Sequence, residues 1–199
     1  MFEKVTYELT QSVCNNDGES LSNLFADNGV YHDYIYGSFK GKKNIKLMLN
    51  NYFHRDAKNF FWEMSDHVFR EDIGYAKFMF AFTSKIPEYL GKKVVVSGIS
   101  FFRFKFNSIV EYSESVNGGI AMVQLGVKPE KMQKVFLKWF KRSLENDFNL
   151  RNFYKSKSSG KNKEHYRALY PKNVVNGHAI LDGANHINIP GHEILAQLL

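Results

Sequence analysis

Hydrophobic and polar residues alternate along two neighbouring segments between Val94 and Val116. This pattern predicts two long antiparallel strands joined by a short turn at residues 106–108, because strand side chains project to opposite faces with a period of two. One face of the second strand is expected to carry Val110, Tyr112 and Glu114, and the other face Ile109, Glu111 and Ser113. Glu114 would then be a carboxylate on an otherwise apolar and aromatic face, which makes it a candidate for chemistry.

The same alternation predicts three more strands, at residues 30–36, 60–68 and 74–82. We expect a turn at residues 71–74 and a loop at residues 37–41. Gly98 and Ser100 interrupt the apolar run of the long strand, which indicates a β-bulge where the sheet curls.

Apolar residues recur at helical spacing in segments before and between these strands. Val5, Leu9 and Val13 recur every four residues in segment 3–14, and a second short helix is expected to carry Leu21, Leu24 and Phe25 on one side. Segment 42–53 is predicted as a third helix. The order of elements favours an α+β fold, a cone-shaped curved antiparallel sheet with the N-terminal helices packed in its concave face.

Length and composition predict one globular domain with a tail. The chain has 199 residues, of which 44% are hydrophobic and 16% aromatic, so a packed core is expected. No apolar run is long enough to cross a bilayer and the N-terminus lacks a signal-peptide pattern, so we expect a cytoplasmic protein. The single cysteine, Cys14, excludes an internal disulfide and is expected to be a buried thiol.

The net charge of +7 is concentrated in one segment, residues 128–157, which has nine Lys and Arg against three Asp and Glu. From Pro129 onward, apolar residues at helical spacing form a stripe that includes Trp139 and Phe140, and lysines occupy the rest. A basic amphipathic helix over residues 128–154 could bind an anionic membrane or a nucleic acid. We favour the alternative, in which the stripe packs on the domain or on a second subunit.

The remaining segment, residues 155–199, is expected to be a flexible polar linker followed by an extended tail. His178, Asp182 and His186 are spaced by four, as metal ligands on one face of a helix would be. Gly177, Gly183 and Asn185 argue against such a helix, so no metal site is predicted there. The domain boundaries therefore fall at residues 1–127, 128–154 and 155–199.

Asp33 is the first catalytic candidate, because it lies in an aromatic run with Tyr31, His32, Tyr34 and Tyr36. Aromatic neighbours can desolvate a carboxylate and raise its pKa towards neutrality, where it can exchange a proton with a carbon next to a carbonyl group. Glu114 is the second candidate and His32 the third. If the strand is regular, only one of His32 and Asp33 points inward, and we favour Asp33. The alternatives are a helix-capping or turn role for Asp33 and an ion-paired rim position for Glu114.

The predicted pocket residues are Tyr31, Trp62, Met64, Phe80, Phe82, Ser100, Phe102, Phe104 and Tyr112. Aromatic residues at strand spacing can equally form a solid core, and both possibilities stay open at this point. No sequence motif supports a nucleotide, haem or zinc site, so no cofactor is predicted.

The segment from Leu24 to Asp33, the following Gly41–Ile45 and the hairpin from Phe102 to Tyr112 resemble the nuclear transport factor 2-like superfamily. The SnoaL-like polyketide cyclases and ketosteroid isomerases are the most similar branches, and the resemblance covers residues 3–126. It implies a cone-shaped fold with an apolar pocket at the open end, commonly in a homodimer.

Asp33 falls on the general base of the ketosteroid isomerases, and Glu114 on a position where cyclase-like members place an acid. The acidic oxyanion donor of the ketosteroid isomerases falls on Ser100, and the tyrosine of that family falls near Leu9. This sequence therefore departs from the steroid isomerase pattern at both positions.

These observations predict a small-molecule pocket enzyme of cyclase or isomerase type, with Asp33 as base and Glu114 or a tyrosine hydroxyl as proton donor. The expected ligand is small and apolar or aromatic. The alternative is a ligand-binding or dimerisation module of the same fold without catalysis. Paired carboxylates at one pocket would favour the enzyme, because they drive their pKa values apart.

Overall fold

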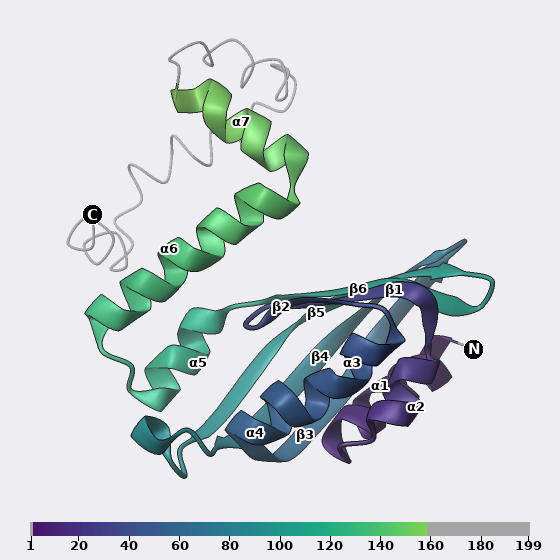
Figure 1. Cartoon of the computed structure of the whole chain (residues 1–199), viewed down its shortest axis with the longest axis horizontal. Coiled ribbons are helices and arrows are strands. Elements are labelled where there is room, and N and C mark those ends of the chain that lie inside the picture. The colour runs from purple at the N-terminus through teal and green to yellow at the C-terminus, as the bar shows by residue number, and fades with distance from the viewer. Residues whose placement is uncertain (1, 159–199) are drawn as a thin grey trace. The chain divides into compact units, whose positions relative to one another are not determined.

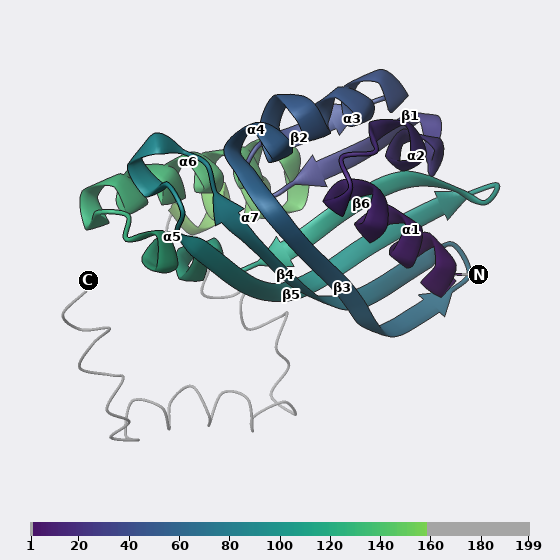
Figure 2. The same cartoon turned by 90° about the horizontal axis from the view of Figure 1, so that it is seen from below.

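A six-stranded curved sheet with helices on one face forms the first part of the chain in the computed structural model, which describes residues 2–158 (Figures 1 and 2). In chain order, the first elements are α1 (Phe2–Cys14), α2 (Gly18–Asn23), β1 (Phe25–Asp33), β2 (Gly37–Lys40), α3 (Lys42–Met48), a π-helical turn (Leu49–Phe53), α4 (His54–Asp56) and β3 (Ala57–Arg70). They are followed by β4 (Ile73–Ser84), a 3-10 turn (Pro87–Tyr89), β5 (Lys93–Lys105), β6 (Ser108–Val116), α5 (Gly118–Leu125), α6 (Pro129–Asn146) and α7 (Phe148–Ser158). The predicted α+β class is confirmed.

The strand order is β2-β1-β6-β5-β4-β3, and the pairs from β3 to β6 are antiparallel as predicted. The expectation of a wholly antiparallel sheet is wrong at one place, because β1 runs parallel to β6 and pairs Tyr31 with Tyr112 and His32 with Ser113. The first strand is therefore inserted beside the last one. Continuing this register brings Asp33 beside Glu114.

The first strand begins earlier and ends earlier than predicted. Phe25, expected on the second helix, starts β1 and is fully buried, with its ring 6.1 Å from that of Tyr31. The strand ends at Asp33, and the segment expected as a loop contains β2, which pairs Asp33 with Gly37. A four-residue strand is too short for alternation to reveal it in the sequence.

The bulge lies further along the hairpin than predicted. At Gly98 the β4–β5 register is continuous, and the shift occurs where Arg103 pairs with Glu111 but Phe104 pairs with Ile109. Val110 is the extra residue, so Ile109 and Tyr112 are both fully buried. The expectation that these two residues lie on opposite faces is wrong for this reason.

Gly98 is required by packing. A Cβ at this position would lie 2.3 Å from the carbonyl oxygen of Ser115 and 2.6 Å from the ring of Phe78. We expect Gly98→Ala to lower the free energy of unfolding by about 1–3 kcal/mol, measured by urea denaturation, because neither neighbour can move without disturbing the sheet. The control is Ser97→Ala at the adjacent exposed position, and equal stability of the two variants would contradict this account.

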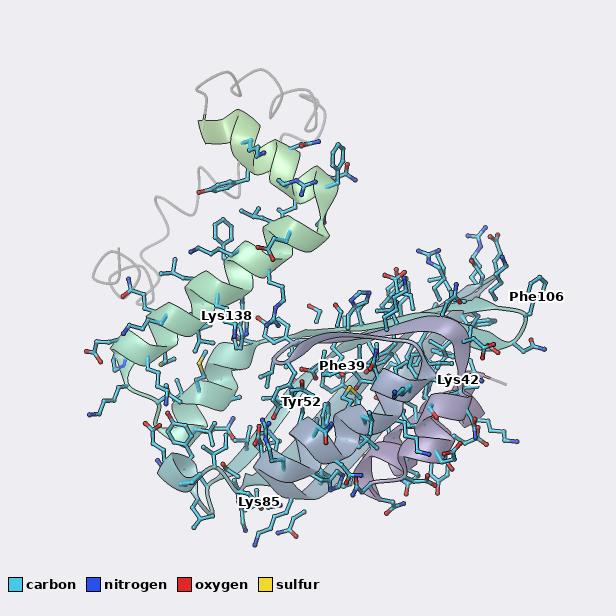
Figure 3. All side chains as sticks on the ribbon, in the orientation of Figure 1. Phe39, Lys42, Tyr52, Lys85, Phe106 and Lys138 are labelled. Carbon is cyan, nitrogen blue, oxygen red and sulfur yellow. The ribbon has the colours of Figure 1, made fainter. Side chains whose placement is uncertain are left out.

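The core lies between the helices and the inner face of the sheet (Figure 2). Leu9 and Val13 of α1 are fully buried, as the helical spacing predicts. Aromatic rings extend the core towards β2, where Phe39 and Tyr52 meet edge to face with their centroids 5.1 Å apart (Figure 3).

The described residues fall into two units that divide between Leu137 and Lys138, within α6. The segment predicted as one basic helix is in fact two, because α6 ends at Asn146 and α7 begins at Phe148, where the Asp147 side chain accepts a hydrogen bond from the backbone N–H of Leu150. The first residues of the predicted linker, 155–158, belong to α7. The rest of the predicted tail, including His178, Asp182 and His186, lies outside the described residues. None of the described helices is both long and apolar enough to span a membrane.

Candidate active site

Asp33 is the last residue of β1, and its side chain bonds to the backbone of the turn that follows. Its Oδ1 accepts hydrogen bonds from the backbone N–H groups of Ile35, at 2.8 Å, and Tyr36. The residue is only 8% exposed. The local turn therefore holds the carboxylate in place at the end of the strand.

Glu114 projects from β6 into the interior and accepts two tyrosine hydroxyl hydrogen bonds on one oxygen. Tyr31 donates to Oε1 at 3.1 Å and Tyr112 donates to the same atom at 3.0 Å. Ser100 lies 2.9 Å from the Tyr112 hydroxyl and completes the buried network. Since Oε1 accepts both bonds, Oε2 is the oxygen that carries the proton when Glu114 is neutral.

The pKa of Glu114 is raised to about 8, first by burial and second by the negative charge of Asp33, while the two tyrosine hydroxyls act in the opposite direction. Burial, followed by the charge of Glu114, also raises the pKa values of Tyr31 and Tyr112 well above the usual range. At neutral pH Glu114 is therefore mostly a neutral acid and both tyrosines are hydrogen-bond donors.

A small cavity of about 50 Å³ lies between the two carboxylates. Its walls are mostly aromatic and aliphatic, and its lining consists of Asp33, Tyr34, Ile35, Phe53, Trp62, Phe78, Phe80, Val96, Glu114 and Val116. Among the described residues no Lys, Arg or His lines it. The space admits only a few non-hydrogen atoms, since a single water occupies about 30 Å³ in the liquid.

His32 lies apart from this cavity. Its Nδ1 is 2.7 Å from the Ser38 hydroxyl, and its Nε2 is 3.9 Å from Glu111. The side chain is 36% exposed, as expected for the residue out of phase with Asp33. The structure therefore offers no contact through which His32 could act on a molecule in the cavity.

The other predicted pocket residues divide into three groups. Trp62 and Phe80 line the cavity, whereas Tyr31, Ser100 and Tyr112 form the hydrogen-bonded layer behind Glu114. The residues that do not line it are Met64, Phe82, Phe102 and Phe104. Phe102 is buried beneath Tyr112, with ring centroids 4.9 Å apart. Phe102 belongs to the core, as the alternative interpretation of the aromatic pattern expected, and Met64 and Phe104 pack against that core.

Several lining residues were missed by the sequence interpretation. Phe78 is in phase with Phe80, and Val116 follows Glu114 by two residues, so strand alternation could have identified both. Val96 lies opposite Phe80 in the β4–β5 register, which no local pattern reveals.

A larger cavity of about 530 Å³ lies at the tips of the two long hairpins. It is walled by Phe2, Phe69 and Phe104. Its charged residues are Glu71, Asp72 and Lys105, which are exposed, and Arg103, which is partly exposed. Phe106 stands at the hairpin tip beside it, 90% exposed (Figure 3). No buried acid or base lines this cavity within the described part of the chain, so the smaller cavity is the better candidate for chemistry.

The described residues contain no cluster of three or more His, Cys, Asp or Glu side chains that could hold a metal ion. The chemistry available from them is thus that of two carboxyl groups at one cavity, one of which has a raised pKa, supported by tyrosine hydroxyls.

The fold is that of the nuclear transport factor 2 and ketosteroid isomerase-like proteins. The chain belongs to the SnoaL-like family, since the family model of the SnoaL-like domain matches residues 8–112. No curated protein matches the chain.

Solved structures of similar fold share little sequence with this chain. A protein of ketosteroid isomerase-like fold from Catenulispora acidiphila DSM 44928, crystallised in complex with trimethylamine, is 15% identical with a TM-score of 0.57, and the match covers 63% of this chain and 94% of that one. A putative SnoaL-like polyketide cyclase from Shewanella denitrificans OS-217 is 14% identical with a TM-score of 0.54, covering 63% and 96%. An LEH-like epoxide hydrolase from M. tuberculosis is 10% identical with a TM-score of 0.51, covering 62% and 87%.

Proposed function

We propose that this SnoaL-like protein is a cofactor-independent isomerase or cyclase that moves a proton between atoms of a small carbonyl compound. The observation that carries the proposal is a pair of carboxyl groups at one cavity, the partly buried Glu114, which is mostly protonated at neutral pH, and the buried Asp33, which is held by two backbone donors. Two acids whose environments separate their proton affinities can serve as acid and base in the same reaction.

In the proposed reaction the Asp33 carboxylate takes a proton from the carbon next to the carbonyl group. Glu114 gives its Oε2 proton to the carbonyl oxygen as the enol forms. Asp33 then returns its proton to a different carbon, and Glu114 recovers its own from the enol oxygen. Both residues end in their starting states, so the net change is an isomerisation without any other reactant.

The cavity volume limits which part of the substrate lies inside. At about 50 Å³ it accommodates a carbonyl group and its neighbouring carbons, well below the roughly 300 Å³ of a pocket that encloses a whole ligand. The rest of the substrate would lie over Ile35, which is 48% exposed, and the partly exposed Val96 and Val116. Ligands with a short carbonyl-bearing end are therefore the first to examine.

Proton exchange tests the proposal without knowledge of the natural substrate. The wild-type protein is incubated in deuterium oxide with a panel of small ketones and enones, and loss of the α-proton signals is followed by NMR. We expect saturable, protein-dependent exchange for at least one compound. Binding of compounds to the cavity without exchange of any α-proton would contradict catalysis and favour a binding module.

A second candidate, a binding site for a small organic ammonium ion without catalysis, is favoured by one observation. The described lining pairs two acidic residues with the rings of Phe53, Trp62 and Phe80 and has no basic residue. Aromatic faces and carboxylates together attract ammonium groups, and the Catenulispora acidiphila protein of similar fold was crystallised with trimethylamine. Saturable binding of trimethylammonium, combined with no exchange in the ketone panel, would favour this function.

We also propose a homodimer in which a second copy packs on the outer face of the sheet. Tyr75, Met79, Val95 and Ile99 present large apolar side chains there, each 44–53% exposed. Several large exposed apolar side chains on one face of two paired strands favour a protein interface there.

Ile99→Glu is expected to convert the dimer to a monomer in light scattering coupled to size exclusion, because it places a charge in the proposed interface. The control is Tyr7→Glu at an exposed position of α1, which should remain dimeric. A wild-type protein that is monomeric at micromolar concentration would refute the homodimer directly.

A further inference from the structure

Trp62 has the one buried side-chain donor in the described part of the chain that lacks a hydrogen-bond partner, its indole Nε1. The residue is 5% exposed, so water does not compensate for the missing bond. A buried donor without an acceptor costs about 1–3 kcal/mol. Such a group in a folded protein calls for an explanation, and one explanation is a ligand that supplies the acceptor.

The location of Trp62 points to the ligand of the acidic cavity. Its side chain forms part of the cavity wall together with Asp33 and Glu114. The ring centroid of Trp62 is 6.5 Å from that of Tyr112, whose hydroxyl donates to Glu114. The indole therefore lies beside the network that holds the acid.

We infer that Trp62 Nε1 donates a hydrogen bond to the oxygen of a carbonyl ligand in this cavity and stabilises the negative charge that develops on that oxygen. The inference rests on the proposed function and specifies its substrate class as an oxygen-bearing molecule. Glu114 and Trp62 would then be two donors to the same oxygen. An ammonium ion, which has no acceptor, could not satisfy the indole.

The family resemblance pointed to Ser100 as the position of the oxyanion donor, but Ser100 is fully buried and bonded to Tyr112 behind Glu114. Trp62 lines the cavity and Ser100 does not. The structure thus assigns the second donor to a different strand, β3. A donor of this kind typically contributes about 10²–10³-fold in rate.

The test is the indole N–H signal of ¹⁵N-labelled wild-type protein titrated with cyclopentanone. The chain has two tryptophans, so Trp62→Phe assigns the Trp62 signal and Trp139 serves as internal control. We expect a downfield shift of the Trp62 N–H proton with cyclopentanone and no such shift with tetramethylammonium. A Trp62 signal that stays in place while Glu114 carbon signals respond to cyclopentanone would overturn the inference.

Trp62→Phe provides a second measurement, since it keeps an aromatic ring in the wall and removes only the donor and part of the volume. We expect α-proton exchange about 10²-fold slower than in wild type, with a thermal midpoint within a few degrees because the lost N–H was unpaired. Unchanged exchange in this variant would overturn the role of Trp62 and leave the proton transfer by Asp33 intact. No exchange in the wild type would instead refute the proposed function itself.

Discussion

Asp33→Asn is expected to lower the rate of α-proton exchange by about 10²–10⁴-fold, the usual contribution of a general base. Asparagine keeps an oxygen that can accept from the backbone N–H groups of Ile35 and Tyr36, so the turn after β1 should persist. What is lost is the ability to take up a proton. The measurement is the NMR exchange assay with the best ketone of the panel.

The matched control is Asp27→Asn, which removes a carboxylate from the same strand at a fully exposed position. This variant should exchange at the wild-type rate. If Asp33→Asn also exchanged at that rate, Asp33 would not be the base, and its buried carboxylate would serve only to cap the turn.

The second large effect concerns stability as a function of pH. The pKa of Glu114 is about 8 in the folded protein against 4.5 as its ordinary value. Between these values the folded state holds a proton that the unfolded state has released, so raising the pH favours unfolding. We expect the free energy of unfolding to fall by up to about 1.4 kcal/mol per pH unit between pH 5 and 8.

Three groups face Glu114 and influence its pKa: Asp33, Tyr31 and Tyr112. Both tyrosines have pKa values raised well above 10 and stay neutral throughout this range. The charge of Asp33 is one cause of the raised pKa of Glu114, so Asp33→Asn should lower that pKa and reduce the total loss of stability between pH 5 and 8. Urea denaturation at pH 5, 6.5 and 8.5 measures the slope.

Glu114→Gln should abolish most of the slope, because glutamine does not titrate. Glu111→Gln, on the other face of β6, serves as control and should keep the decline between pH 5 and 8. Parallel stability curves for Glu114→Gln and the wild type would show that another group is responsible, and the assignment of a neutral acid at this position would fail.

The inward direction of Asp33 and Glu114 could be predicted from the sequence, because side-chain direction in a strand follows directly from the period of two. The helices at residues 3–14 and 42–53 were predictable for the same reason, from the spacing of Leu9 and Val13 and of similar pairs. These features depend on local backbone geometry alone.

Features that depend on contacts between distant segments could not be predicted in this way. The parallel pairing of β1 with β6 is decided by the packing of the whole sheet, and the extra residue Val110 moves Ile109 to the buried side. The unpaired indole N–H of Trp62 and the volume of the cavity depend on how the aromatic side chains around them pack. Catalysis by the acid pair stays a prediction until exchange is measured.

The parallel pairing of β1 with β6 also has a consequence for how this protein acquires its site. Tyr31 and Tyr112 are neighbours although 80 residues separate them in the chain, so their meeting closes a very long loop, and such closures are among the slow events of folding. On a ribosome, a chain emerging only as far as β5 would hold Asp33 paired with Gly37 of β2 but without Glu114 on its other side. The acid pair can exist only after the final strand has docked, so more than half of the 199 residues must be synthesised before any proton chemistry is possible.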